Sequence, residues 1–310
     1  MIIINNLDDI TTPYRNAVVT IGNFDGVHKG HQALFRQVRL QAEKIGGTAV
    51  AITFEPHPMR VLKKEGYPPH ITRYDQKIEL LSQTDIDVLI CIPFTIEFSE
   101  ITAQSFVEDM LLQKIGMKSI IVGKDYSFGK NREGNIGFLQ TASAGFGFEV
   151  IVVDWEYNDA GRHERISSTR IREIVMQGRV AEAKNLLGRY YQIRGKVVGG
   201  RNRGGKLLGF PTANIRLHDE LCPKTGVYAV TVECSVGNFM GVANIGYSPT
   251  FDDHVFTVEV HILNFNENIY DQRIRVNFID RLRDERKFNN ITELSNQIKK
   301  DIEKARMILA

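Results

Sequence analysis

The stretch GNFDGVHKGH, residues 22–31, decides the fold of the first half of the chain. It follows the apolar run at residues 17–21, which predicts a buried strand, and it leads into a predicted helix at residues 31–45 with one apolar face: Leu34, Val38, Ala42 and Ile45. Gly22 and Gly26 permit turn conformations and a close backbone approach to a ligand. A helix N-terminus presents free N–H groups and a positive dipole end, so the stretch predicts a phosphate-binding turn.

The same alternation of strand and helix continues through the first half. Apolar runs predict strands at 48–54, 88–92, 119–122 and 149–153. Helical patterns lie between them, at 74–83, 103–115 and 136–144, and two short helices follow at 169–177 and 180–187. Alternating elements predict a parallel sheet with helices on both faces.

The pattern changes near Gly188. Five β-type runs follow with turn residues between them, at 191–198, 226–233, 239–244, 256–263 and 272–278, and they predict an antiparallel sheet or a small barrel. A last helix is predicted at 291–308, where Asn290 and Glu293 form a capping-box-like start. We therefore predict two domains, residues 1–186 and 187–310.

Composition excludes several classes of protein. The 310 residues are 43% hydrophobic and 25% charged, with a net charge of +2, which argues against a nucleic-acid coat protein or a polybasic membrane binder. No apolar run approaches the roughly 20 residues of a membrane span. The three cysteines form no CxxC pair, and this indicates reduced thiols in a cytoplasmic protein.

Two segments of the first half carry groups suited to phosphate. His28 and His31 are three apart at the helix start and can donate to phosphate oxygens; two surface histidines that cap a helix are the plain alternative, and zinc lacks a third ligand nearby. The segment ISSTRIR, residues 166–172, precedes a helix that Ser168 or Thr169 could cap. Its hydroxyls and Arg172 could meet a triphosphate, although alone it is a routine helix start.

Two further segments end predicted strands with rings and prolines. Residues 53–58 read TFEPHP and residues 123–129 read GKDYSFG. Open α/β sheets bind ligands at the carboxyl ends of their strands. Such surfaces suit a flat ring system, and ordinary loop packing is the alternative.

The second half carries a different set of candidates. Residues 200–207 nearly match a P-loop, but Leu207 replaces the Ser or Thr that holds Mg²⁺, and no helix follows. Thr212 and Asn214 are alternate residues of an extended segment, so their oxygens can face one Mg²⁺ ion. Glu259 lies inside an apolar predicted strand, where a carboxylate needs an explanation. It is either a general base or an outward-facing residue of a half-exposed strand.

His28-Lys29-Gly30-His31 resembles the HxGH signature of the nucleotidyltransferase superfamily, in which an ISSTxIR segment closes the ATP site. With the two ring-suited segments, the first half is similar to the FMN adenylyltransferase module of prokaryotic bifunctional riboflavin kinase/FAD synthetases, although Tyr126 stands where Phe is more common. The resemblance implies a Rossmann-like domain with His28, His31 and Arg172 as catalytic residues. It implies ATP contacts from Gly22, Asn23, Phe24, Asp25, Gly30, Ser167, Ser168 and Thr169, and flavin contacts from Phe54, Pro56, His57, Pro58, Asp125, Tyr126 and Phe128.

The second half resembles the riboflavin kinase module of the same family, because residues 209–214, 226–228, 241–246, 249–251, Glu259 and 281–283 occur in that module's order. The resemblance implies a six-stranded antiparallel barrel with a C-terminal helix. It implies Mg²⁺ on Thr212 and Asn214, Glu259 as the base, and ATP or flavin contacts from Gly199, Lys206, Gly209, Phe210, Pro211, Asn244 and Arg283. The acidic pair Asp252-Asp253 is unexpected beside a triphosphate.

The resemblance implies two steps, in which ATP phosphorylates riboflavin to FMN and a second ATP adenylylates FMN to FAD. Two other functions remain open here: a cytidylyl- or pantetheine-type transferase, against which the ring-suited segments argue, and a flavin-binding regulatory module without catalysis, against which the intact candidate residues argue. The expected partners are ATP, riboflavin and FMN, with no nucleic acid and no membrane. A weak homo-oligomer is left open.

Overall fold

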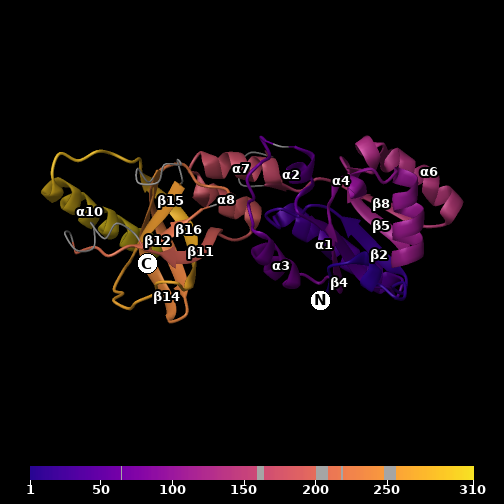
Figure 1. The fold of residues 1–310 in the computed structure, drawn as a ribbon, viewed down its shortest axis with the longest axis horizontal. Coiled ribbons are helices and arrows are strands. Elements are labelled where there is room, and N and C mark those ends of the chain that lie inside the picture. Colours follow the sequence, from indigo (N-terminus) through magenta and orange to yellow (C-terminus); the bar gives the residue numbers. More distant parts are fainter. Residues whose placement is uncertain (64, 159–163, 200–208, 218, 248–255) are drawn as a thin grey trace. The chain divides into compact units, whose positions relative to one another are not determined.

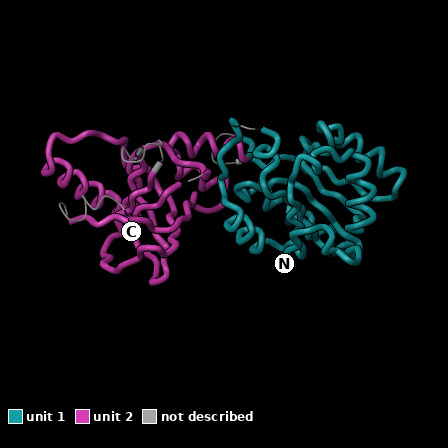
Figure 2. The backbone as a smooth tube through the Cα atoms, viewed as in Figure 1, with its two compact units in different colours: residues 1–167 teal, residues 168–310 magenta. Residues whose placement is uncertain are grey.

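The computed structural model describes residues 1–63, 65–158, 164–199, 209–217, 219–247 and 256–310. The described chain divides into two compact units, residues 1–167 and 168–310 (Figure 2). Two helices at the start of the second unit, α7 (Ser168–Met176) and α8 (Val180–Leu187), pack against each other, and α8 also contacts strands of that unit.

The first unit is built on six parallel strands in the order β1-β4-β3-β2-β5-β8 (Figure 1). Their bounds are β1 (Ile2–Ile4), β2 (Ala17–Ile21), β3 (Ala49–Glu55), β4 (Val88–Pro93), β5 (Met117–Gly123) and β8 (Glu149–Val153). The chain runs outward from β2 through β3 to β4, then returns to β5 on the other side of β2. This confirms the predicted parallel sheet and places its topological switch point between β2 and β5.

Helices cover both faces of this sheet. On one face, α1 (Lys29–Lys44) and α3 (Tyr74–Ser82) bury Phe35, Val38 and Leu81 against the strands. On the other face, the π-helical η2 (Phe106–Ile115) and α6 (Ile136–Phe146) contribute Leu111 and Leu139 to a second apolar cluster. Burial of apolar surface on both faces stabilises the unit by about 25 cal/mol per Å².

Short elements connect these parts of the first unit. They are η1 (Leu7–Asp9), α2 (Pro58–Leu62), α4 (Ile96–Ser99), α5 (Ala103–Ser105), β6 (Ser127–Phe128), η3 (Lys130–Arg132), β7 (Gly134–Asn135), β9 (Tyr157–Asn158) and β10 (Glu164–Arg165). Among the described residues, no helix combines the length and the apolar character needed to cross a membrane.

The second unit contains a closed antiparallel barrel in the order β11-β12-β15-β14-β13-β16. Its strands are β11 (Tyr191–Val198), β12 (Ala213–Arg216), β13 (Gly226–Cys234), β14 (Gly237–Tyr247), β15 (Phe256–Ile262) and β16 (Arg273–Arg283). The final helix α10 (Ile291–Leu309) begins at Asn290, whose side chain accepts from the backbone N–H of Glu293, and buries Ala305 against the barrel. The predicted barrel and terminal helix are confirmed.

Candidate functional site

Three candidate segments of the first unit lie at one edge of its sheet. Residues 22–31 follow β2, residues 56–58 follow β3, and residues 124–129 follow β5. Because β3, β2 and β5 are neighbours and all run parallel, their carboxyl ends lie side by side. This edge is where open α/β sheets bind ligands, at the switch point.

The two histidines of the HxGH signature stack at the start of α1. Their ring centroids are 3.6 Å apart with planes inclined by 18°. His28 is the N-cap, and its Nδ1 accepts from the backbone N–H of His31 at 3.3 Å. With Nδ1 as an acceptor, the proton of the neutral ring lies on Nε2. A Cβ at Gly30 would come within 3.2 Å of the His28 ring, so glycine allows the ring to lie over the helix start.

Phe24 and Asp25 support this turn from within. The Phe24 ring is buried and meets His31 edge-on, with centroids 5.3 Å apart. The buried carboxylate of Asp25 accepts from the backbone N–H groups of Ile71 and Thr72, at 3.1 and 3.0 Å. These contacts fasten the turn to residues 71–72, while direct ATP contacts from Phe24 and Asp25 stay predictions.

The segment that contains ISSTRIR begins beside the HxGH turn. A Cβ built on Gly30 would lie 3.7 Å from the carbonyl oxygen of Ile166. Ser167 ends the first unit, whereas Ser168, Thr169 and Arg172 lie in the first two turns of α7 in the second unit. Their predicted contacts with the triphosphate therefore stay predictions.

The end of β3 presents a ring, and the segment after it presents a capped helix start. Phe54 packs edge-on against Phe94, with centroids 5.6 Å apart. His57 caps α2, because its Nδ1 accepts from the backbone N–H of Met59 at 3.1 Å. Pro56 is exposed and Pro58 is the first residue of the helix. An exposed proline beside aromatic rings is compatible with the predicted flavin contact.

The segment after β5 adds two stacked rings. Tyr126 and Phe128 have centroids 5.4 Å apart and planes inclined by 20°. Burial raises the pKa of the Tyr126 hydroxyl. Asp125 is exposed and accepts from Arg165 at 2.5 Å. Phe128 is buried in the core, so the surface of this segment is formed mainly by the residues that precede it.

In the second unit, Glu259 stands between two asparagines. It lies directly opposite Asn214 of β12 and Asn244 of β14 in the two ladders. Paired residues of an antiparallel sheet project to the same face, so the three side chains share one face. Val258 and Val260 are fully buried while Glu259 is exposed, so Glu259 has the outward position of the plain alternative. The asparagines beside it make this position a polar site.

The segment before β12 extends that polar face. The side-chain amide nitrogen of Asn214 donates to the carbonyl of Thr212 at 3.3 Å, which leaves the amide oxygen as the atom for a cation. The Pro211 carbonyl lies 2.8 Å from Nδ1 of His261, and the Phe210 ring meets that histidine edge-on. Residues 210–214, which are predicted to belong to the kinase site, thus run alongside β15 from His261 to Glu259.

Arg283 is held by a partner that sequence reasoning missed. Its guanidinium forms a bidentate ion pair with the buried carboxylate of Asp301 on α10, at 3.0 and 2.8 Å. The pair joins β16 to the terminal helix, while the predicted ligand contact of Arg283 is untested. Gly199 and Gly209 border residues 200–208. That range, which contains Lys206, and the Asp252-Asp253 pair lie outside the described residues.

Glu285 is a second residue near Glu259 that sequence reasoning missed. A Cβ at Gly246 would collide with its carboxylate and would lie 3.6 Å from the side-chain nitrogen of Asn244. Although Glu259 is exposed overall, neighbouring groups desolvate its carboxylate, and this, followed by the negative charge of Glu285, raises the pKa of Glu259. Sequence spacing offered no signal, because residues 246 and 285 belong to different strands and loops.

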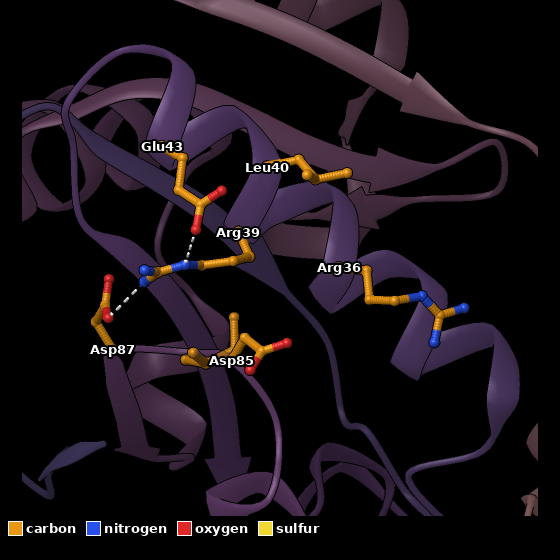
Figure 3. A pocket seen from close by; sticks show the side chains of 7 residues that line it. Arg36, Arg39, Leu40, Glu43, Asp85 and Asp87 are labelled. Atoms are coloured by element: carbon orange, nitrogen blue, oxygen red, sulfur yellow. Dashed lines mark hydrogen bonds and ion pairs between the residues drawn. The ribbon is translucent and has the colours of Figure 1, made fainter.

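A separate pocket of about 630 Å³ lies at the C-terminal half of α1 (Figure 3). Arg39 donates to Glu43 at 2.8 Å and to Asp87 at 2.9 Å, so its charge is compensated there. Because the candidate histidines lie at the opposite end of α1, this pocket is distinct from the predicted ATP segment.

Comparisons with known proteins follow the same division. The sequence model of the FAD synthetase family matches residues 11–170, and that of the riboflavin kinase family matches residues 187–309. A bifunctional riboflavin kinase/FMN adenylyltransferase of Haemophilus influenzae is 39% identical, over 99% of this chain and 98% of its own. Its namesake from Listeria monocytogenes is 37% identical, over 95% and 93%.

Solved structures match the fold as well. A protein of Streptococcus pneumoniae, described as a macrolide-efflux protein, superposes with a TM-score of 0.86 at 36% identity, over 98% of both chains. The HxGH turn, the Glu259 face, the two family matches and the full-length relatives agree. The chain therefore belongs to the family of bifunctional riboflavin kinase/FMN adenylyltransferases.

Proposed function

We propose that the chain makes FAD from riboflavin in two steps, each consuming one ATP, at two separate sites. The observation that carries the kinase site is the position of Glu259 between Asn214 and Asn244 on one face of the barrel. The stacked His28 and His31 at the switch point carry the adenylyltransferase site. We expect the enzyme to work in the cytoplasm, without a nucleic acid or membrane partner.

In the first step, Glu259 accepts the proton of the riboflavin 5′-hydroxyl. The hydroxyl oxygen forms a bond to the γ-phosphorus of ATP, the bond to the bridging oxygen breaks, and ADP leaves with FMN as the other product. Asn214 lies opposite the base in the ladder, and Thr212 precedes it by two residues in the chain. Both offer oxygen ligands of the kind that Mg²⁺ prefers. Bound Mg²⁺ would neutralise charge on the phosphates.

In the second step, an FMN phosphate oxygen attacks the α-phosphorus of another ATP, and pyrophosphate leaves. The attacking phosphate is already ionised, so this step needs no strong base. It needs fixed donors where charge develops on the α-phosphate and on the leaving pyrophosphate. His28 and His31 supply such donors at the helix N-terminus, together with the predicted Ser168 and Arg172.

Product analysis tests this function. The protein is incubated with riboflavin, ATP and Mg²⁺, and the flavins are separated by chromatography over time. FMN should rise first and FAD should follow at its expense. FMN without FAD would remove the adenylyltransferase assignment, and no FMN would remove the kinase assignment.

The rate of the kinase reaction should fall as the solution becomes acidic, and the midpoint of this fall should lie above the ordinary glutamate pKa of 4.5. Glu259 must be ionised to act as a base, and both causes of its shift disfavour the ionised form. Activity is therefore present above the raised pKa and is lost as the pH falls through it. Glu285→Gln removes one of the two causes of the raised pKa of Glu259. The acid limb of the pH profile of kcat/KM for riboflavin should therefore move to lower pH.

The matched control is Glu303→Gln, which removes an exposed carboxylate from α10. Its pH profile should coincide with that of the unchanged enzyme. An acid limb that stays in place in Glu285→Gln would show that Glu285 does not act on the base.

A further inference from the structure

Lys77 is a charged residue of the first unit, buried beneath the sheet edge at which the candidate ligand-binding segments lie. It belongs to α3, and only 6% of its surface is exposed. Lysine is rarely buried to this extent unless its ammonium group has partners.

The ammonium nitrogen of Lys77 joins the loop after β2 to the end of β3. It lies 3.5 Å from the carbonyl oxygen of Asn23 and 3.4 Å from the carbonyl oxygen of Phe54. The Thr53 hydroxyl lies 3.4 Å from it and itself donates to the Asn23 carbonyl at 3.2 Å. Asn23 precedes the HxGH turn, and Phe54 begins the predicted flavin segment. One side chain thus holds both ligand segments.

The charge of Lys77 is only partly countered. Its carboxylate neighbour is Glu55, at 3.7 Å, whose side chain is 38% exposed. Burial lowers the pKa of Lys77, although Glu55 and Asp25 oppose this. Burial removes the ammonium group from water, a free-energy cost that an apolar residue of the same length would avoid. Positive charge in this place is favourable when a ligand brings several negative charges to the same edge.

We propose that Lys77 is a positioning residue for adenylyl transfer. Its ammonium group fixes the Asn23 turn against the end of β3 and so sets the distance between the triphosphate-binding and flavin-binding segments. This proposal rests on the proposed adenylyltransferase function. The reacting atoms must be held about 3–3.5 Å apart and aligned, so a small shift of one segment is costly.

Lys77→Met tests the proposal in the full chain, with supplied FMN, ATP and Mg²⁺. The kcat for FAD formation should fall about 10- to 100-fold, the cost of a small misplacement. KM for ATP and FMN should change less than kcat, because each segment keeps its own ligand contacts. Lys77→Arg, which keeps charge and donors, should recover most of the loss. Lys118→Met removes an exposed lysine of β5 and should change neither value.

Far-UV circular dichroism and thermal unfolding of the full chain report whether the variant is folded, because the kinase site belongs to the other compact unit and its rate does not report on the unit that contains Lys77. A folded Lys77→Met whose kcat for FAD formation stays within twofold of that of the unchanged enzyme would overturn the proposal. A fall in kcat that Lys77→Arg does not relieve would also overturn it. If Lys77→Met does not fold, Lys77→Gln takes its place, because it removes the ammonium group and shortens the side chain that joins the Asn23 and Phe54 carbonyls. An unchanged kcat for FAD formation in a folded Lys77→Gln would overturn the proposal. Failure of the unchanged enzyme to make FAD would instead refute the adenylyltransferase function.

Discussion

Replacement of Glu259 by glutamine is expected to slow riboflavin phosphorylation by about 10²- to 10⁴-fold, the usual contribution of a general base. Glutamine keeps the size and the hydrogen-bonding capacity of the side chain, and the position is exposed, so the barrel should fold unchanged. The rate is measured as FMN formed from riboflavin and ATP. Adenylylation of supplied FMN should keep its normal rate, because His28 and His31 belong to the other compact unit.

The control for this change is Glu267→Gln, an exposed carboxylate in the loop that follows β15. It should leave both rates unchanged. If Glu259→Gln phosphorylated riboflavin at the normal rate, another group would be the base. If it lost both activities while folded, the two reactions would not have separate sites.

Replacement of His31 by alanine is expected to give the opposite pattern. FAD formation from supplied FMN should fall by about 10²- to 10³-fold, the cost of removing one donor to a transition-state charge. His28, the N-cap of α1, is kept in this variant, so the helix start should persist. The rate is measured as pyrophosphate released from ATP, and riboflavin phosphorylation in the same sample should be normal.

His31→Gln is the matched variant, because glutamine retains an N–H donor. It should be more active than His31→Ala in adenylylation. Equal and small effects of both changes would assign the ring a packing role against Phe24 and His28, with which it is in contact.

Local pattern predicted most elements of the fold. The predicted helix at 180–187 and the predicted strand at 149–153 match α8 and β8 residue for residue, since each has a clear apolar period and a turn residue at its end. The edge strand β1 was missed. It has three residues, and its parallel pairing with β4 is a contact between distant segments that no local period records. The π-helical form of η2 is likewise a departure that the helical period did not show.

The candidate site was predictable where chemistry follows from short motifs. The HxGH turn and Glu259 were found because their residues are close in sequence or stand out in an apolar strand. Lys77 and Glu285 were missed, because their roles depend on tertiary neighbours. In a helical pattern a lysine is expected to face solvent, yet packing buries Lys77 under the ends of two strands.

The most direct test of two separate sites is a mixing experiment. Glu259→Gln and His31→Ala are each incubated with riboflavin, ATP and Mg²⁺, alone and together, and FAD is measured by chromatography. Alone, the first should make almost no FMN and the second should accumulate FMN with almost no FAD. Together they should form FAD, because FMN released by the His31→Ala chain is adenylylated by the Glu259→Gln chain. Absence of FAD from the mixture, with both chains folded and FMN present, would contradict the account.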